Sequence, residues 1–394
     1  MDLTPGLRRP PDLPADEPLP ESDPILVERI RAEIAERGPM TFARFMDLAL
    51  YDPEHGYYSA AEARPGRAGD FITAPEAHPI FGRTLGRALD EMWRLMGEPD
   101  RFVVRDYGAG GGALAVAILG GLVADRSGLA VAIRYIPVEV NPTRTRELHE
   151  RLAAAGLADR LASEIEAGPG CAIANEFLDA LPVHRVEWRE GRLRELYVSW
   201  DGGFVERAGP PSTPALGERL AADGIALGEG QRAEICLAID SWATGVTAAV
   251  HRGFALAIDY GHPADVLYGP ERPDGTLRAY VRHRVHADPF RHVGRQDLTA
   301  HVDFTAVARA LEGRGWRTLG LTSQAEFLVG SGAAEVAEAL RREPGVTVEG
   351  LLALRSALAR MVDPRATGGF RVLVAGRGLP EGAGLNGLGY RLRS

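Results

Sequence analysis

The first hundred residues carry a helical pattern of apolar and polar positions. Apolar residues recur with helical spacing from Ile25 to a glycine stop at Gly38, after an Asp-Pro start signal. The same spacing predicts a short helix over residues 41–51 and a longer amphipathic helix over residues 80–97. We therefore expect an N-terminal helical region at residues 25–100.

From residue 101 onward, short apolar runs alternate with helical stretches. The runs "RFVVRDYG", "VAIRYIPVEV" and "GCAIANEF" predict strands, and the segments between them predict helices. Such alternation favours a parallel, doubly wound α/β sheet. We place the first half of this sheet at residues 101–181 and the second half at residues 229–394, where "GGFRVLVAGRG" predicts a terminal strand.

Two segments interrupt the alternation. Residues 182–228 alternate apolar and polar side chains across two turns that contain glycine, which predicts an antiparallel β-insertion. Residues 262–299 are expected to form a long loop on the substrate side. Within this loop, residues 278–295 carry five arginines, so the segment is either a solvated loop or a docking site for an acidic partner.

Composition limits the class of protein. The 394 residues carry a formal net charge of −9, and residues 1–24 are rich in proline and acidic side chains, which predicts a disordered tail. An acidic chain is a poor candidate for nonspecific binding of nucleic acid. No run approaches the ~18 apolar residues of a membrane span, so we expect no membrane insertion. The two cysteines lie in apolar runs, which favours a cytoplasmic protein without a metal site.

The stretch "FVVRDYGAGGGAL" places four glycines where a strand meets a helix. The first N–H groups of a helix lack partners within the helix, and a ligand can reach them only where no Cβ intervenes. Asp106, Gly108, Gly110 and Gly112 match the first motif of methyltransferases that use S-adenosylmethionine at every position. In that arrangement the glycine backbone approaches the methionyl part of the ligand, and Asp106 helps to fix its ammonium group.

A carboxylate follows the next predicted strand. Glu139, in "YIPVEVNP", can accept hydrogen bonds from both ribose hydroxyls of such a cofactor. A nicotinamide-dependent oxidoreductase is the competing interpretation, because a dinucleotide fold also uses a glycine-rich turn. That fold places its acidic residue ~20 residues after the turn, whereas Glu139 follows Gly108 by about 31, so the methyltransferase interpretation is preferred.

Several motifs occur together in one order: "GDFITAPEAHPIFG", the glycine loop, "VEVNP", "ANEFLDALPVHRVEW", "AIDYG", "GTLRAY", "QDLTAHVDFT" and "TSQAEFLVGSG". As an ordered set they resemble the MidA-type methyltransferases. The resemblance implies a class I, Rossmann-like fold with a mostly parallel seven-stranded sheet, and an S-adenosyl-L-methionine cofactor. It also implies arginine methylation of a protein partner, because the mitochondrial members methylate a core subunit of respiratory complex I.

An arginine acceptor needs carboxylates beside the site of transfer. Protonated guanidinium is a poor nucleophile, and carboxylates can grip two of its N–H groups while a third nitrogen faces the methyl group. We expect Glu176 and Asp179, in "NEFLDALP", to take this catalytic role. Asn175 either contacts the adenosyl group or caps the turn.

The segment before the sheet is a candidate lid. "GDFITAPE" combines polar residues with Gly69 and Pro75, and the resemblance favours a cofactor-binding role for Thr73 over a plain helix cap. At the end of another predicted strand, Asp259 and Tyr260 either line the acceptor pocket or form a turn. A non-catalytic assembly factor with the same fold remains an alternative to an enzyme, and an oligomer is possible.

Overall fold

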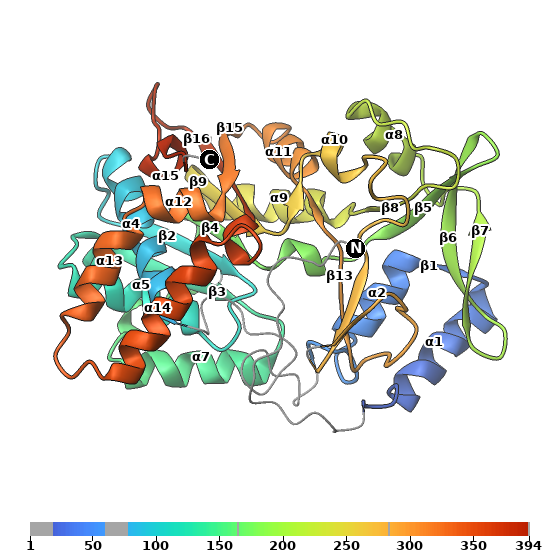
Figure 1. The fold of residues 1–394 in the computed structure, drawn as a ribbon, viewed down its shortest axis with the longest axis horizontal. Coiled ribbons are helices and arrows are strands. Elements are labelled where there is room, and N and C mark those ends of the chain that lie inside the picture. The colour runs from blue at the N-terminus through green and yellow to red at the C-terminus, as the bar shows by residue number, and fades with distance from the viewer. Residues whose placement is uncertain (1–18, 60–77, 164, 283, 393–394) are drawn as a thin grey trace.

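The computed structural model describes residues 19–59, 78–163, 165–282 and 284–392 (Figure 1). Residues 1–18 of the tail expected at residues 1–24, and the candidate lid residue Thr73, therefore lie outside the described residues. Within the described ranges, none of the helices combines the length and the apolar character that crossing a membrane requires.

A six-stranded sheet forms the centre of the larger half of the molecule. Four strands run parallel, and the terminal strand runs antiparallel to both of its neighbours. In spatial order, the strands are β15 (Arg317–Ser323), β16 (Arg371–Arg377), β9 (Val250–Asp259), β4 (Gly168–Asn175), β2 (Phe102–Tyr107) and β3 (Ile133–Val138). The predicted mostly parallel α/β sheet is thus present.

The expected number of seven strands is wrong for the described part of the chain. Beyond β3, the place of a further edge strand is marked only by an isolated parallel bridge between Tyr135 and Leu161. Leu161 packs against the core of the central sheet, whereas Ile165 is 92% exposed.

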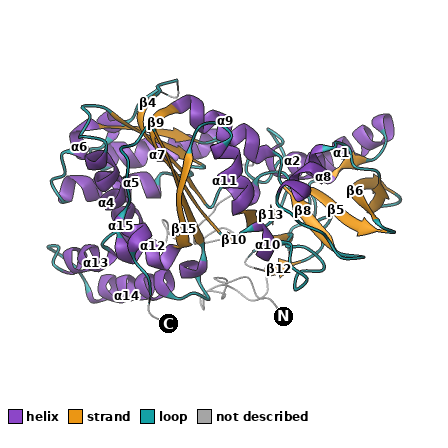
Figure 2. Ribbon diagram, turned by 90° about the horizontal axis from the view of Figure 1, so that it is seen from above, coloured by secondary structure: helices purple, strands orange, loops and turns teal. Residues whose placement is uncertain are grey.

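Helices cover both faces of this sheet (Figure 2). Side chains of β9 alternate between the two faces: Phe254, Leu256 and Ile258 enter one core, whereas Ala255 and Ala257 enter the other. The first core is closed by α4 (Ile80–Leu95), α5 (Ala113–Ala124), α7 (Pro142–Ala154), α12 (Gln324–Gly330), α13 (Ala333–Arg341) and α14 (Val348–Val362). The second core is closed by α9 (Ala238–Ala249) and α11 (Phe304–Glu312).

A second, antiparallel sheet forms the other half of the molecule, on the right of Figure 1. It contains β1 (Met40–Thr41), β6 (Arg192–Trp200), β5 (His184–Arg189), β8 (Arg232–Ile235) and, paired with β6, β7 (Phe204–Gly209). Glu190 and Gly191 connect β5 to β6 with φ values of 54° and 71°, which suit a two-residue turn whose twist matches the strands. The β-insertion therefore recruits β1 from the N-terminal region and β8 from the chain that follows it.

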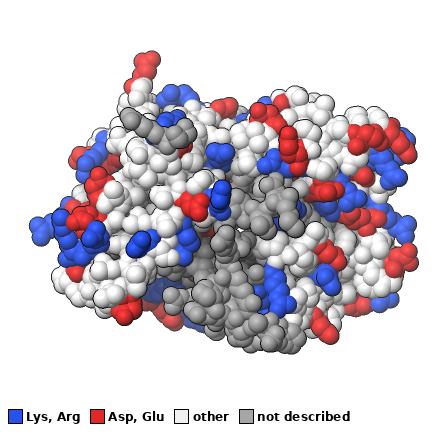
Figure 3. All heavy atoms as spheres, viewed as in Figure 1, with Lys and Arg blue, Asp and Glu red and all other residues white. Residues whose placement is uncertain are grey.

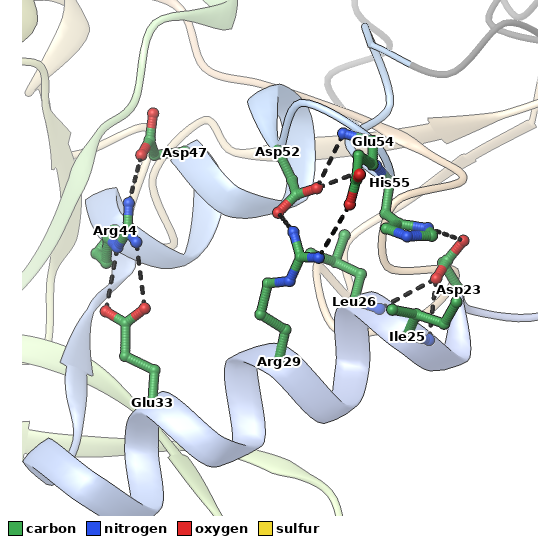
Figure 4. Close-up of polar contacts among 10 residues, drawn as sticks. All are labelled: Asp23, Ile25, Leu26, Arg29, Glu33, Arg44, Asp47, Asp52, Glu54 and His55. Atoms are coloured by element: carbon green, nitrogen blue, oxygen red, sulfur yellow. Dashed lines mark hydrogen bonds and ion pairs between the residues drawn. The ribbon is translucent and has the colours of Figure 1, made fainter.

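The N-terminal helices divide between the two halves. Helices α1 (Pro24–Arg37) and α2 (Phe42–Tyr51) share a core with the second sheet, whereas α4 packs in the core of the central sheet. The side chain of Asp23 caps α1, accepting from the N–H groups of Ile25 and Leu26 at 3.0 Å (Figure 4). The expected N-terminal region is therefore not one structural unit.

The segment expected as a long loop at residues 262–299 contains a small antiparallel sheet. Strand β11 (Arg278–Val281) pairs with β12 (Arg284–His286) on one side and with β13 (Asp297–Thr299) on the other. Its arginines obscured the strand pattern, although Ala279, Tyr280 and Val281 are all buried. On the face in Figure 3, acidic and basic side chains are interspersed.

The remaining described elements are short connections. They are α6 (Leu129–Ala132), η1 (Ala158–Arg160), η2 (Leu178–Ala180), α8 (Ala215–Ala222), β10 (Gly261–His262), α10 (Ala264–Leu267), β14 (Val302–Asp303), η3 (Thr367–Gly369) and α15 (Asn386–Gly389).

Candidate active site

A cavity of about 290 Å³ lies at the carboxyl ends of the central strands. Its lining comes from the segments that follow β2, β3, β4 and β9, and also from the end of α2 and from β13. Open α/β sheets bind ligands at this edge. The cavity is lined by all of the predicted site residues except Gly112 and Thr73, and Thr73 is among the residues not described.

The glycine loop forms the wall beside β2 and β3. Gly108 and Gly110 have φ values of 72° and 54°, a region that favours glycine. A Cβ on Gly110 would have no heavy atom within 4 Å, so it would enter the open cavity. A Cβ on Gly108 would lie 3.0 Å from the Phe177 ring. The bare backbone at Gly110 therefore keeps space free for a ligand.

Gly112 has a different reason to be glycine. Its φ is 83°, and a Cβ there would lie 2.8 Å from Cγ and 3.0 Å from Cα of Leu148. Leu148 belongs to α7, so Gly112 lets the loop pack against that helix. Gly112, predicted as a cofactor-binding residue, thus has a packing role and lies outside the cavity lining.

Asp106 is buried at the base of the cavity, with 2% of its surface exposed. It accepts a hydrogen bond of 2.6 Å from the hydroxyl of Tyr135. Burial raises the pKa of Asp106 to about 7, against the effect of the Tyr135 bond, and the nearby charge of Glu139 raises it further. A bound cation would stabilise the ionised form, as expected of a group that holds an ammonium.

Glu139 is fixed by two backbone groups. One carboxylate oxygen accepts from the N–H of Gly110 and the other from the N–H of Asn141, each at 2.9 Å. These bonds tie the end of β3 to the glycine loop and hold the carboxylate at the cavity wall. A carboxylate has about four acceptor positions, so the predicted bonds to ribose hydroxyls remain available.

The wall beside β4 and β9 is a tight turn. Glu176 has a φ of 49°, uncommon for a residue with a side chain, and its N–H donates to the carbonyl of Ile258 at 2.9 Å. Asn175 is 9% exposed, and its amide donates to Glu176 at 3.4 Å. The Asn175 side-chain oxygen is buried without a hydrogen-bond partner among the described residues, which is the state expected of a group that faces a ligand.

Asp259 lies outside the cavity lining and holds this turn in place through hydrogen bonds. One of its oxygens accepts from the N–H groups of residues 177–179 at 3.0–3.2 Å, and the other accepts from the N–H of Tyr260 at 2.9 Å. Burial, followed by the charges of Asp179 and Glu176, raises the pKa of Asp259 well above its usual range. Asp259 does not line the cavity, whereas Tyr260 does.

Asp179 faces the cavity from the same turn. It is 7% exposed, and the hydroxyl of Tyr260 donates to it. Burial raises the pKa of Asp179 to about 6, while the Tyr260 bond and backbone N–H groups oppose that rise. The carboxylate can therefore exchange a proton near neutral pH.

The sequence interpretation missed the wall contributed from outside the central sheet. Tyr51, Tyr57 and Tyr58 reach the cavity from the end of α2, and Asp297 and Thr299 reach it from β13. The cluster of tyrosines in "YDPEHGYY" was the available signal, because a surface turn has no packing need for three aromatic rings. Asp297 and Thr299 lie in "QDLTAHVDFT", one of the motifs that carry the family resemblance, although the sequence interpretation gave them no role.

Oxygen acceptors and open backbone suit a nucleoside cofactor better than a metal. Among the described residues, no group of three or more histidine, cysteine or acidic side chains is arranged to hold a metal ion. Gly108 and Gly110, Asp106 and Glu139 supply an open main chain and two carboxylates for an amino acid end and a ribose. The residues present therefore fit S-adenosylmethionine.

The fold and this cavity define a Rossmann-like methyltransferase. A sequence model of a family described as S-adenosyl-L-methionine-dependent methyltransferase matches residues 84–322. A Burkholderia thailandensis protein crystallised with S-adenosyl-homocysteine is similar over 94% of this chain and 97% of its own, at 34% identity and a TM-score of 0.84.

Similar proteins also occur in animals. The mitochondrial protein arginine methyltransferase NDUFAF7 homolog of Drosophila melanogaster is 32% identical over 327 residues, which cover 74% of this chain and 70% of the fly protein. The human protein arginine methyltransferase NDUFAF7 is 27% identical over 350 residues, covering 79% and 75%. The chain belongs to the MidA-type family of S-adenosylmethionine-dependent methyltransferases.

Proposed function

We propose that this protein methylates an arginine side chain of a partner protein. The observation that carries the proposal is that one cavity joins the glycine loop and Glu139 to the carboxylates of Glu176 and Asp179. Relatives named as protein arginine methyltransferases support an arginine acceptor. The family resemblance suggests a respiratory complex I subunit as the partner, and we retain a cytoplasmic location as a prediction.

The residues beside β2 and β3 would hold the cofactor. The main chain at Gly108 and Gly110 would admit its methionyl part, Asp106 would hold its ammonium, and Glu139 would accept hydrogen bonds from its ribose. When bound, S-adenosylmethionine supplies a methyl group activated on a sulfonium.

The residues beside β4 and β9 would orient the acceptor. Glu176 and Asp179 can each accept N–H groups of a guanidinium, which fixes the plane of the acceptor and leaves one nitrogen free. That nitrogen loses a proton when it forms a new bond to carbon. Asp179 can take this proton, because burial raises its pKa to about 6, much closer to neutrality than that of an exposed aspartate.

The test is mass spectrometry of arginine methylation in the host proteome. Deletion of the gene should remove a methyl mark from a defined arginine, and Glu176→Gln should fail to restore it. Glu150→Gln, which changes an exposed carboxylate on α7 outside the cavity lining, should restore the mark.

Three results would argue against the proposal. A lost mark on another type of residue would overturn the arginine acceptor. Restoration by Glu176→Gln would remove Glu176 from the reaction. An assembly defect without any change in methylation would favour the non-catalytic assembly factor.

A further inference from the structure

Besides Glu176, the acceptor end of the cavity contains two acidic side chains that come from different parts of the fold. Asp179 follows β4, whereas Asp297 belongs to β13 and is 4% exposed. The N–H of Ala300 donates to the carbonyl of Asp179 at 3.0 Å, so the segment that carries Asp297 is joined to the turn that carries Asp179. Both side chains line the same cavity.

Each carboxylate is held by a tyrosine hydroxyl. Tyr260 donates to Asp179, and Tyr58 donates to both oxygens of Asp297, at 2.9 and 3.0 Å. Burial, followed by the charge of Asp297, raises the pKa of Tyr58 well above its ordinary value. The Tyr58 hydroxyl therefore keeps its proton and remains a donor at neutral pH.

The three tyrosine hydroxyls at this end already donate hydrogen bonds within the protein. A tyrosine hydroxyl has one hydrogen, and those of Tyr58 and Tyr260 go to carboxylates, while that of Tyr51 goes to the carbonyl of Ala180 at 3.0 Å. The Asn175 amide donates to Glu176, and the Asn175 oxygen is a buried acceptor without a partner among the described residues. These acceptor oxygens therefore favour a ligand that supplies hydrogen-bond donors.

We propose that Asp297, held by Tyr58, is a specificity-determining residue which, with Asp179, restricts the methyl acceptor to a cation with several N–H donors. The inference rests on the proposed function, and it adds a residue and a selection rule to it. A guanidinium carries five N–H donors and no acceptor, which complements the acceptor oxygens of Asp179, Asp297 and Asn175. A neutral acceptor offers these carboxylates fewer N–H donors and no opposite charge.

The test uses small probes on the whole protein saturated with S-adenosylhomocysteine. The probes are ethylguanidinium and N-ethylurea, which have similar shapes but differ in charge, and binding is followed by protein-observed NMR. The wild-type protein should bind ethylguanidinium at least about tenfold more tightly than N-ethylurea, since charged hydrogen bonds are stronger than neutral ones.

Asp297→Asn should abolish most of this preference. The substitution keeps the shape of the side chain and an oxygen for Tyr58, but it removes the charge. Affinity for ethylguanidinium should fall about tenfold or more, while affinity for S-adenosylhomocysteine stays within about twofold. Asp288→Asn, an equal change of charge at an exposed position of the same segment, should behave as wild type.

Equal binding of the two probes by the wild-type protein would overturn the inference, as would unchanged ethylguanidinium binding by Asp297→Asn. Retained S-adenosylhomocysteine binding shows that a variant is folded and that its cofactor site is intact. Failure of the inference would then not affect the conclusion that the protein uses this cofactor. If the wild-type protein did not bind S-adenosylhomocysteine, the proposed function itself would be contradicted.

Discussion

Several residues that line the cavity adopt a backbone conformation or a burial state that lowers the stability of the fold. Glu176 adopts a φ of 49°, and Asp106 and Asp179 are acids buried beside a cavity. A left-handed backbone costs roughly 1–2 kcal/mol for a residue with a Cβ. Such features persist only where the surrounding structure enforces them, and here the bonds from Asp259 to the turn provide that support.

Asp106 should make stability depend on pH. Its pKa is about 7 in the folded chain and near 3.8 when unfolded, so the folded state binds more protons between these values. The free energy of unfolding must then fall as pH rises from about 4 to about 7. Asp106→Asn should remove this part of the fall, measured by urea denaturation at pH 5 and pH 8. An unchanged difference between the two pH values would show that Asp106 is not perturbed.

Single residues in the sequence also predicted the cofactor wall best, that is, the side of the cavity next to β2 and β3. Asp106, Gly108, Gly110 and Glu139 lie at consecutive strand ends, so their proximity follows from the parallel sheet alone. Gly112 matched the same motif, but its conformation is set by Leu148, which comes from α7. A motif shows that glycine is needed and does not show which neighbour requires it.

At the scale of elements, the contact between α1 and the end of α2 determines the position of the tyrosines that follow α2. The side chain of Asp52 accepts from the N–H groups of Glu54 and His55 and pairs with Arg29 of α1 (Figure 4). Asp52 is 4% exposed, whereas Glu54, the other partner of Arg29, is largely exposed. This junction leads directly into the turn that carries Tyr57 and Tyr58.

Asp52→Ala should therefore be much more costly than Glu54→Ala. We expect Asp52→Ala to lower the free energy of unfolding by about 2 kcal/mol, because two partly buried N–H groups and the guanidinium of Arg29 lose their acceptor. Glu54→Ala should cost at most about 1 kcal/mol, as is usual for an exposed ion pair. Chemical denaturation measures both. Equal losses would mean that burial of Asp52 does not determine its contribution.

Elements with a regular period were predictable, and those without one were not. Short apolar runs predicted β2, β3 and β4, and alternating apolar and polar positions with turn signals predicted the hairpin of β5 and β6. The short strands β11 and β13 were missed, since three or four residues give no measurable period. Asp297 and Thr299 of the acceptor wall belong to β13, so this part of the cavity could not be predicted from local pattern.

At the scale of the whole molecule, the cavity lies where two halves of the chain meet. The central sheet supplies the cofactor wall, and α2 with β13 supplies much of the acceptor wall. Buried residues of α1, α2 and the small sheet share one core, so the acceptor wall is stabilised as a unit. Substitutions in one wall can thus alter the choice of acceptor without altering cofactor binding, as expected of a fold that supports many chemistries.

The most direct test of cofactor binding is a calorimetric titration of S-adenosylhomocysteine into the wild-type protein, Gly110→Ala and Gly191→Ala. Both glycines have a positive φ and open space at the Cβ position, but only Gly110 lines the cavity. Backbone strain is thereby matched between the two variants. We predict binding by the wild-type protein, at least about a tenfold loss in Gly110→Ala, and a change within about twofold in Gly191→Ala. Equal affinity of all three proteins, or no binding by the wild-type protein, would contradict the placement of the cofactor against this loop.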